Sequence, residues 1–176
     1  IWIISTWQMF GKPKKFNVVE LGPGDGSLTK IFLQTSKRFP DFNAAKKIYL
    51  YEVSNLLKNL QKKNIKNNEV KWIKTFKHIN DGPVIFFGNE FLDSIPIKQF
   101  KSEKGFLFEK YYKLDKNKNI KEVFKKASKH DAINIKSYKS LQNLKFIEFP
   151  KYGFKELEKM IKKILQLKGC LLIFDY

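Results

Sequence analysis

The sequence predicts an α/β protein whose parallel sheet is covered on both faces. Short apolar runs, which indicate strands, alternate with segments whose apolar residues recur at helical spacing. Each strand run is apolar at consecutive positions, as expected for a strand buried on both faces. A glycine-rich turn follows the first strand and leads directly into a helix. With 176 residues, 43% of them hydrophobic, the chain is long enough to form a globular core.

Helices and strands alternate through the first half of the chain. Strands are predicted over residues 16–21, 47–51, 70–73 and 84–87. A first helix over residues 1–10 carries an apolar face and is ended by Gly11 and Pro13. A second helix covers residues 27–38, with Leu28, Ile31 and Phe32 predicted to point inward, and Pro40 closes that unit. Ser54 is a suitable N-cap for a third helix that bears Leu57 and Leu60.

The pattern changes after the fourth strand. Strand-like pieces cover residues 97–114 with a turn at Lys104 and Gly105, and a second turn is predicted over residues 115–119. Residues 116–144 are rich in lysine and asparagine, so we assign them no regular element and treat them as an insertion. A helix resumes at Gly153, ends at Gly169 and precedes a strand over residues 170–174. This division predicts a cofactor-binding part over residues 1–96, an inserted substrate or partner subdomain over 97–150, and the last helix and strand over 151–176.

Composition excludes several classes of function. The net charge is +18, but Arg38 is the one arginine among 35 basic residues, and the lysines are scattered over every segment. Scattered lysines favour a solvated surface over a nucleic-acid site, which tends to use clustered arginine and aromatic residues. Cys170 is the one cysteine, and His78 and His130 lack partners at ligand spacing, so we expect neither a disulfide framework nor a metal site. No apolar run is long enough to cross a bilayer.

The stretch from Val18 to Leu28, VVELGPGDGSL, reads as strand, tight turn and helix start. Glycines at positions 22, 24 and 26 allow positive φ and close approach of a ligand to the backbone. Asp25 at the centre of the turn would repel a pyrophosphate, and the glycine spacing differs from the dinucleotide G-x-G-x-x-G pattern. S-adenosylmethionine, a sulfonium cation with a ribose and an amino-acid head, therefore matches the turn better than NAD. The alternative is an ordinary tight turn between strand and helix.

Acidic residues gather where the predicted strands end, although the chain holds only 17 acids. Because the carboxyl ends of parallel strands meet at one edge of a sheet, this edge is expected to be acidic. Glu52, about 25 residues beyond the turn, is placed to accept the ribose hydroxyls of the cofactor, and Glu20 with Asp25 would face its ammonium and methionine portion. Glu90 and Asp93 lie where a substrate would approach the methyl group. The alternative for some of them is a helix N-terminal acid. The six acids are Glu20, Asp25, Glu52, Glu90, Asp93 and Asp175.

Four motifs together resemble the MidA-like family, which includes a mitochondrial protein arginine methyltransferase that acts in complex I assembly, and bacterial relatives. They are VVELGPGDGSL, YEVS at residues 51–54, GNEFLDSIPIKQF at residues 88–100 and LLIFDY at residues 171–176. The resemblance implies a seven-stranded Rossmann-like class I methyltransferase, of which this chain holds about strands one to five, with an inserted subdomain between strands four and five. Gly22, Gly24, Gly26 and Glu52 carry over as cofactor positions. Asn89, in the third motif, completes the predicted cofactor site, beside Glu90 and Asp93 as the predicted catalytic pair.

The resemblance predicts methylation of an arginine in a protein substrate, such as a complex I subunit, with S-adenosylmethionine as cofactor. Both chain ends look cut, so we expect an internal fragment that is inactive by itself. The protein is expected in the cytoplasm if it is bacterial and in the mitochondrial matrix if it is eukaryotic. Three alternatives remain open: a non-catalytic assembly or scaffold protein, an NAD-dependent oxidoreductase, and an RNA methyltransferase, which the N-E-F-x-D-x-x-P motif disfavours.

Overall fold

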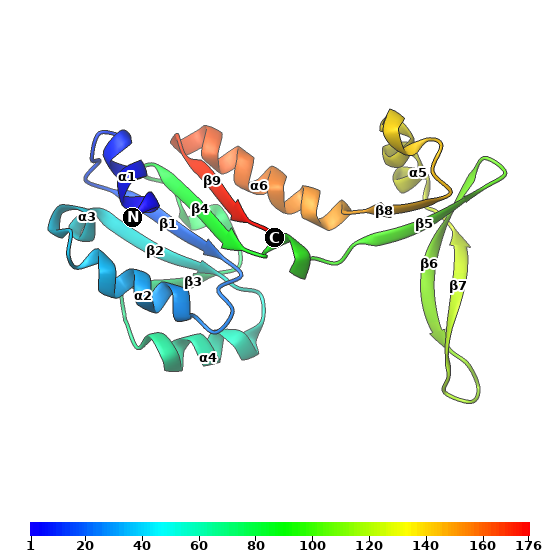
Figure 1. The fold of residues 1–176 in the computed structure, drawn as a ribbon, viewed down its shortest axis with the longest axis horizontal. Helices are drawn as coiled ribbons and strands as arrows, with labels where there is room; N and C mark the ends of the chain where they lie inside the picture. The colour runs from blue at the N-terminus through cyan, green and yellow to red at the C-terminus, as the bar shows by residue number, and fades with distance from the viewer. The chain divides into compact units, whose positions relative to one another are not determined.

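A computed structural model describes all 176 residues of the chain, and these divide into two compact units. The first unit comprises Ile1–Ser94 and Glu156–Tyr176, and the second comprises Ile95–Lys155. The first unit is therefore built from two separate stretches of the sequence, which Figure 1 shows in its blue-to-green and orange-to-red colours. None of the helices combines the length and apolar character needed to span a membrane.

The first unit contains a five-stranded parallel sheet with the strand order β3-β2-β1-β4-β9, which confirms the predicted fold class (Figure 1). The strand order reverses at β1, because β2 and β4 pair with its two sides. In open α/β sheets, ligands bind outside the carboxyl ends of the strands at such a reversal. The strands are β1 (Phe16–Leu21), β2 (Lys46–Tyr51), β3 (Val70–Ile73), β4 (Val84–Asn89) and β9 (Cys170–Phe174).

Helices of the first half of the chain pack on one face of this sheet. The apolar side chains of β1 and β4 on this face form a core with α1 (Trp2–Met9) and α3 (Pro40–Ala45). Those of β2 and β3 pack against α2 (Ser27–Ser36) and α4 (Asn55–Ile65). The strands have continuous apolar sequences because their opposite face is covered as well.

Aromatic side chains and α6 cover the other face. The ring of Phe76, in the short helix η1 (Phe76–His78), lies 4.7 Å from the ring of Tyr51 and 4.9 Å from that of Phe86. The Tyr51 hydroxyl donates a hydrogen bond of 2.8 Å to Glu156 of α6 (Lys151–Leu167). The end of β2 is thereby tied to the C-terminal stretch of the first unit.

The inward faces of α2 and α4 differ in part from the prediction, although Phe32 packs against the core as predicted. Helix α2 buries Thr29, Leu33 and Ser36, whereas Leu28 and Ile31 are exposed. Helix α4 buries Gln61 and Ile65 and leaves Leu57 and Leu60 exposed. Polar side chains take the inward positions because they find hydrogen-bond partners there, which removes most of the cost of burying them. Pro40 also differs from its prediction, because it begins α3 instead of closing the preceding unit.

The second unit is a four-stranded antiparallel sheet with the order β7-β6-β5-β8. Helix α5 (Lys129–Ser137) contributes Ile135 to a core that also contains Phe100 and Ile147 from the sheet. Residues 116–144, to which the sequence analysis assigned no element, thus contain the whole of β7 and α5 and the short helix η3 (Lys139–Leu141). The strands are β5 (Lys98–Glu103), β6 (Phe106–Leu114), β7 (Ile120–Lys126) and β8 (Phe146–Phe149).

A buried ion cluster anchors α5 to the second unit. Asp131 is 1% exposed and forms ion pairs with Lys98, at 3.0 Å, and with Lys151. Burial alone would raise the pKa of Asp131, but the two ammonium groups hold it well below its usual range. The side chain is therefore charged at neutral pH, and its two lysine partners compensate that charge.

Candidate functional site

The turn between β1 and α2 lies at the reversal of strand order. Its three glycines all have positive φ, between 56° and 85°. A Cβ on Gly26 would lie 2.9 Å from the Cδ1 atom of Ile65 on α4, whereas a Cβ on Gly24 would meet nothing within 4 Å. Gly26 is therefore required for packing against α4, and the open side of the turn at Gly24 is accessible to a ligand.

Phe91 connects this turn to the segment after β4. A Cβ on Gly88, in β4, would lie 3.0 Å from the Cβ of Phe91 and 3.1 Å from the Cβ of Leu21. A Cβ on Gly22 would lie 3.1 Å from the ring of Phe91. The backbone at the ends of β1 and β4 can therefore close around Phe91 only because both positions are glycine. The predicted cofactor turn and the predicted catalytic segment are neighbours across this ring.

Hydrogen bonds fix Glu52 at the end of β2. Its side chain is almost buried, and its Oε1 accepts from the backbone N–H of Ser54 at 2.7 Å, while its Oε2 accepts from the side-chain amide of Gln61 at 3.0 Å. The same amide donates to the carbonyl of Gly24 at 2.9 Å, and the Gln61 oxygen accepts from the indole N–H of Trp72 at 2.9 Å. Gln61 thus ties Glu52 to the glycine turn, and each carboxylate oxygen keeps one lone pair for a ligand.

Glu20, in β1, and Asp25, in the turn that follows it, have different environments. Glu20 is 4% exposed and accepts a hydrogen bond from the hydroxyl of Thr29 on α2. Burial raises its pKa to about 7, although the Thr29 bond acts in the opposite direction. Asp25 is exposed, and its two oxygens accept from the backbone N–H and the hydroxyl of Ser27, at 2.9 Å and 2.7 Å. These bonds lower the pKa of Asp25, and they hold the first residue of α2.

The remaining predicted acids are exposed at the carboxyl ends of β4 and β9. Glu90 follows β4 with a φ of 51°, a conformation uncommon for a residue other than glycine, and its N–H donates to the carbonyl of Phe174 at 2.8 Å. Asp93 lies on the short helix η2 (Leu92–Ser94). Asn89, the last residue of β4, and Asp175 are exposed too. The structure holds no group of three or more acids, histidines or cysteines that could bind a metal ion.

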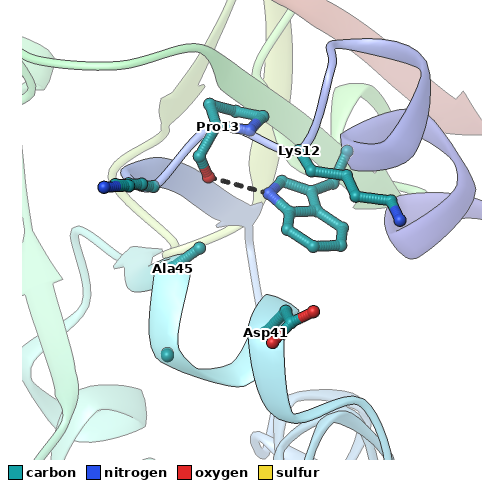
Figure 2. Close-up of a pocket in the computed structure, with 7 residues that line it drawn as sticks. Lys12, Pro13, Asp41 and Ala45 are labelled. Carbon is teal, nitrogen blue, oxygen red and sulfur yellow. Dashed lines mark hydrogen bonds between the residues drawn. The ribbon is translucent and has the colours of Figure 1, made fainter.

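A hollow of about 460 Å³ lies at the opposite ends of the strands, where β1 and β2 begin (Figure 2). Trp7, Lys12, Pro13, Asp41 and Ala45 are among its lining residues. The Trp7 indole donates a hydrogen bond of 2.9 Å to the carbonyl of Pro13, so it fixes the entry into β1. No predicted site residue lines this hollow.

Comparison with known proteins identifies the family. Residues 1–176 match the model of a family described as "Putative S-adenosyl-L-methionine-dependent methyltransferase". The chain belongs to this methyltransferase family. The resemblance to MidA-like proteins is thereby confirmed, and the cofactor of the family is S-adenosylmethionine.

Relatives of known activity support this assignment. The chain is 29% identical over 140 residues to the mitochondrial protein arginine methyltransferase NDUFAF7 homolog of Caenorhabditis elegans, a match that covers 68% of this chain and 32% of that protein. It is 24% identical over 199 residues to the mitochondrial protein arginine methyltransferase NDUFAF7 of Danio rerio, with 100% of this chain and 47% of that protein covered. The chain thus spans less than half the length of these relatives.

A solved structure confirms the fold. The crystal structure of a Burkholderia thailandensis protein bound to S-adenosyl-homocysteine matches the chain with a TM-score of 0.65 and 15% identity. The match covers 87% of this methyltransferase chain and 40% of the Burkholderia chain.

The residues at the reversal of strand order suit the family cofactor. The open side of the turn at Gly24 leaves room for a ligand close to the backbone, and the free lone pairs of Glu52 can accept the two hydroxyls of a ribose. Of the six acids predicted to form one edge, Glu20, Asp25 and Glu52 bond within the protein. The hydrogen bonds that these three side chains accept therefore help to order the turn and the residues beside it.

Sequence analysis did not identify three residues that build this site. Thr29 bonds Glu20, Gln61 bonds Glu52, and Phe91 fills the space between the two loops. The apolar spacing of α4 held no signal for Gln61, because Leu57 and Leu60 are exposed and the inward position is polar. Phe91 had no signal either, because its role depends on Gly22 in the turn and Gly88 in β4, which lie far apart in the sequence.

Proposed function

We propose that the full-length protein binds S-adenosylmethionine at the reversal of strand order and methylates an arginine of a protein substrate. The observation that carries the proposal is the position of Glu52. Gln61 holds its carboxylate beside the glycine turn, and each carboxylate oxygen keeps a free lone pair. In this proposal Glu52 accepts the ribose hydroxyls, and Gly22, Gly24 and Gly26 let the cofactor approach the backbone. Asn89 lies at the end of β4, where it would border the same cofactor.

The proposed roles of Glu20 and Asp25 concern the amino-acid end of the cofactor. Asp25 lies in the turn and Glu20 in β1 directly before it; a cationic ammonium group would meet the negative charge of Asp25 and would favour the ionised form of Glu20. Asp25 keeps its bonds to Ser27, so it acts by charge and by holding the start of α2. Glu20 is held in place by the hydrogen bond that it accepts from the Thr29 hydroxyl of α2.

Glu90 and Asp93 are the proposed catalytic residues. S-adenosylmethionine supplies an electrophilic methyl group when bound. A guanidinium is a poor nucleophile because its pKa lies above about 12. A carboxylate pair can hold the guanidinium so that one nitrogen faces the methyl group, and it can take up the proton that this nitrogen loses. The exposed side chains of Glu90 and Asp93, beside the turn, are available to a substrate.

The second unit, Ile95–Lys155, is the proposed substrate or partner subdomain. We place the protein in the mitochondrial matrix if its source is eukaryotic, because the animal relatives named above are mitochondrial, and in the cytoplasm if it is bacterial. A complex I subunit is the proposed substrate, on the resemblance to the MidA-like family.

Methylation can be tested on proteins extracted from cells that lack the gene. The full-length protein is incubated with them and with S-adenosylmethionine carrying a labelled methyl group, and methylarginine is measured after acid hydrolysis. Glu90→Gln is expected to lower methylarginine by about 100-fold while the dissociation constant for the cofactor changes less than about twofold. Asp41→Asn, at the opposite ends of the strands, is the matched control and should keep wild-type activity. Label in RNA or in methyllysine, or full activity of Glu90→Gln, would contradict the proposal.

A further inference from the structure

A second hollow, of about 350 Å³, lies in the first unit on the face of the sheet that η1 and α6 cover. Its floor includes Tyr51 and Phe76, and the residues after β3 form one side of it. The opposite side belongs to α6. Five lysines surround this lysine pocket: Lys74, Lys77, Lys159, Lys162 and Lys163.

Positive charge exceeds negative charge around the lysine pocket. Lys159 pairs with Glu156 at 2.6 Å, and Lys162 pairs with Glu158 at 2.7 Å. Lys74 and Lys163 instead donate to the neutral amide oxygens of Asn55, at 3.1 Å, and of Asn80 and Gln166, at 3.4 Å and 3.0 Å. Amide oxygens do not cancel the charge of an ammonium group. The lysine pocket is therefore suited to an anionic ligand.

The lysines line the pocket from two sides. Those of α6 occupy positions 159, 162 and 163, and they span about 6 Å along the helix at a rise of about 1.5 Å per residue. Lys74 and Lys77 face this side from the segment after β3. A single phosphate needs converging donors, whereas a row of carboxylates along a peptide needs charges distributed in this way.

The floor favours a protein segment over single-stranded nucleic acid. Tyr51 and Phe76 are only 6% and 5% exposed, and their rings pack on each other with centroids 4.7 Å apart. A base stacks on an open aromatic face, and neither ring offers one. The lining is nevertheless mostly apolar, because the methylene stems of the lysines add to the edges of the two rings, and an aliphatic side chain can contact this surface. We propose that the lysine pocket is a docking site for an acidic segment of a partner protein, with Asp or Glu side chains along the lysines and an aliphatic side chain on the floor. This inference does not depend on methyl transfer.

Binding of an acidic peptide to the full-length protein tests the proposal. The probe is a fluorescein-labelled 12-residue peptide of Asp and Glu with one central leucine, followed by fluorescence anisotropy at low ionic strength. The double variant Lys77→Glu with Lys163→Glu should weaken binding by about tenfold or more. The control is Lys30→Glu with Lys71→Glu, which changes net charge equally at exposed positions of α2 and β3 and should weaken binding less than about twofold. Circular dichroism checks that both double variants fold.

Three results would overturn the docking site. The first is an equal loss of affinity in the two double variants, which would show a response to net charge alone. The second is unchanged affinity when the peptide leucine is replaced by aspartate, because the apolar floor would then have no role. The third is tighter binding of a 12-nucleotide deoxythymidylate than of the peptide, with the same loss in the pocket variant, which would assign the lysine pocket to nucleic acid. Absence of peptide binding by the wild-type protein also refutes it.

Discussion

Replacing Gln61 by methionine tests the hydrogen-bond system that positions Glu52. Methionine has a similar length and volume, so the change removes polar atoms without leaving a large cavity. The side chain is fully buried, and the replacement breaks its bonds to Glu52, Trp72 and Gly24. The Glu52 carboxylate, itself almost buried, is left with one of its two partners.

The expected loss of stability follows from these three bonds. A hydrogen bond to a charged buried group contributes about 2 kcal/mol, and the neutral bond to the half-buried Trp72 contributes about 1 kcal/mol. The carbonyl of exposed Gly24 can turn to water, so its lost bond costs little. We therefore expect Gln61→Met to lower the free energy of unfolding by about 3 kcal/mol.

Urea denaturation followed by circular dichroism measures this loss. Gln34→Met, at an exposed position of α2, is the matched control and should change the free energy of unfolding by less than about 0.5 kcal/mol. The affinity for S-adenosylmethionine should fall in Gln61→Met and stay unchanged in Gln34→Met. A loss of less than about 1 kcal/mol for Gln61→Met would refute the account of Glu52 as a side chain held by Gln61.

Three further predictions concern single residues. The pKa of Glu20 is raised from 4.5 to about 7 in the folded protein, so the folded state binds the proton more tightly than the unfolded state does. The free energy of unfolding should therefore fall by about 3 kcal/mol as the pH rises from about 4.5 through 7. Thermal unfolding of Glu20→Gln across this range should lack that part of the slope, and an identical slope would contradict the prediction. Gly26→Ala should lower the free energy of unfolding by about 2 to 4 kcal/mol, because the positive φ and the contact with Ile65 both oppose a Cβ. Gly105→Ala, also at positive φ but in open space, should lower it by only about 1 kcal/mol. Urea denaturation measures both losses, and equal losses would argue against the contact. Asp131→Asn should destabilise the second unit by about 3 kcal/mol, because it leaves Lys151 without its carboxylate and Lys98 with Glu109 alone. Hydrogen exchange of α5 should rise accordingly, and an unchanged exchange rate would contradict the prediction.

The buried strands could be predicted from the sequence because both of their faces are covered. The predicted ranges 16–21, 70–73 and 170–174 agree with β1, β3 and β9, and those of β2 and β4 differ only at their ends. A strand without a solvated face has a continuous apolar sequence, which stands out in any composition. The parallel arrangement follows from the helices between these strands.

Helix orientation could not be predicted from apolar spacing. On α2 and α4 the spacing pointed to leucines and isoleucines that are exposed, while Thr29 and Gln61 face the sheet. Their inward positions depend on hydrogen bonds to Glu20 and Glu52, which lie nine residues earlier in each case, in β1 and directly after β2. Such partners become visible only when the fold is known.

The elements between residues 116 and 149 were not predicted, for a different reason. Strand β7 is exposed along almost its whole length. Because it has no buried face, its sequence is rich in lysine and shows no regular alternation of apolar and polar residues. Strand β8 was missed because it has only four residues, although Ile147 and Phe149 are buried. Helix α5 has a weak apolar stripe, because its buried Asp131 interacts with lysines of other elements.

Calorimetric titration of the full-length protein tests the central claim most directly. We predict that S-adenosylmethionine binds, that NAD does not, and that Glu52→Ala raises the dissociation constant for S-adenosylmethionine by about tenfold or more through the lost bonds to the ribose. Equal affinity of the wild-type protein and Glu52→Ala, or binding of NAD in place of S-adenosylmethionine, would contradict the site described at the ends of β1, β2 and β4.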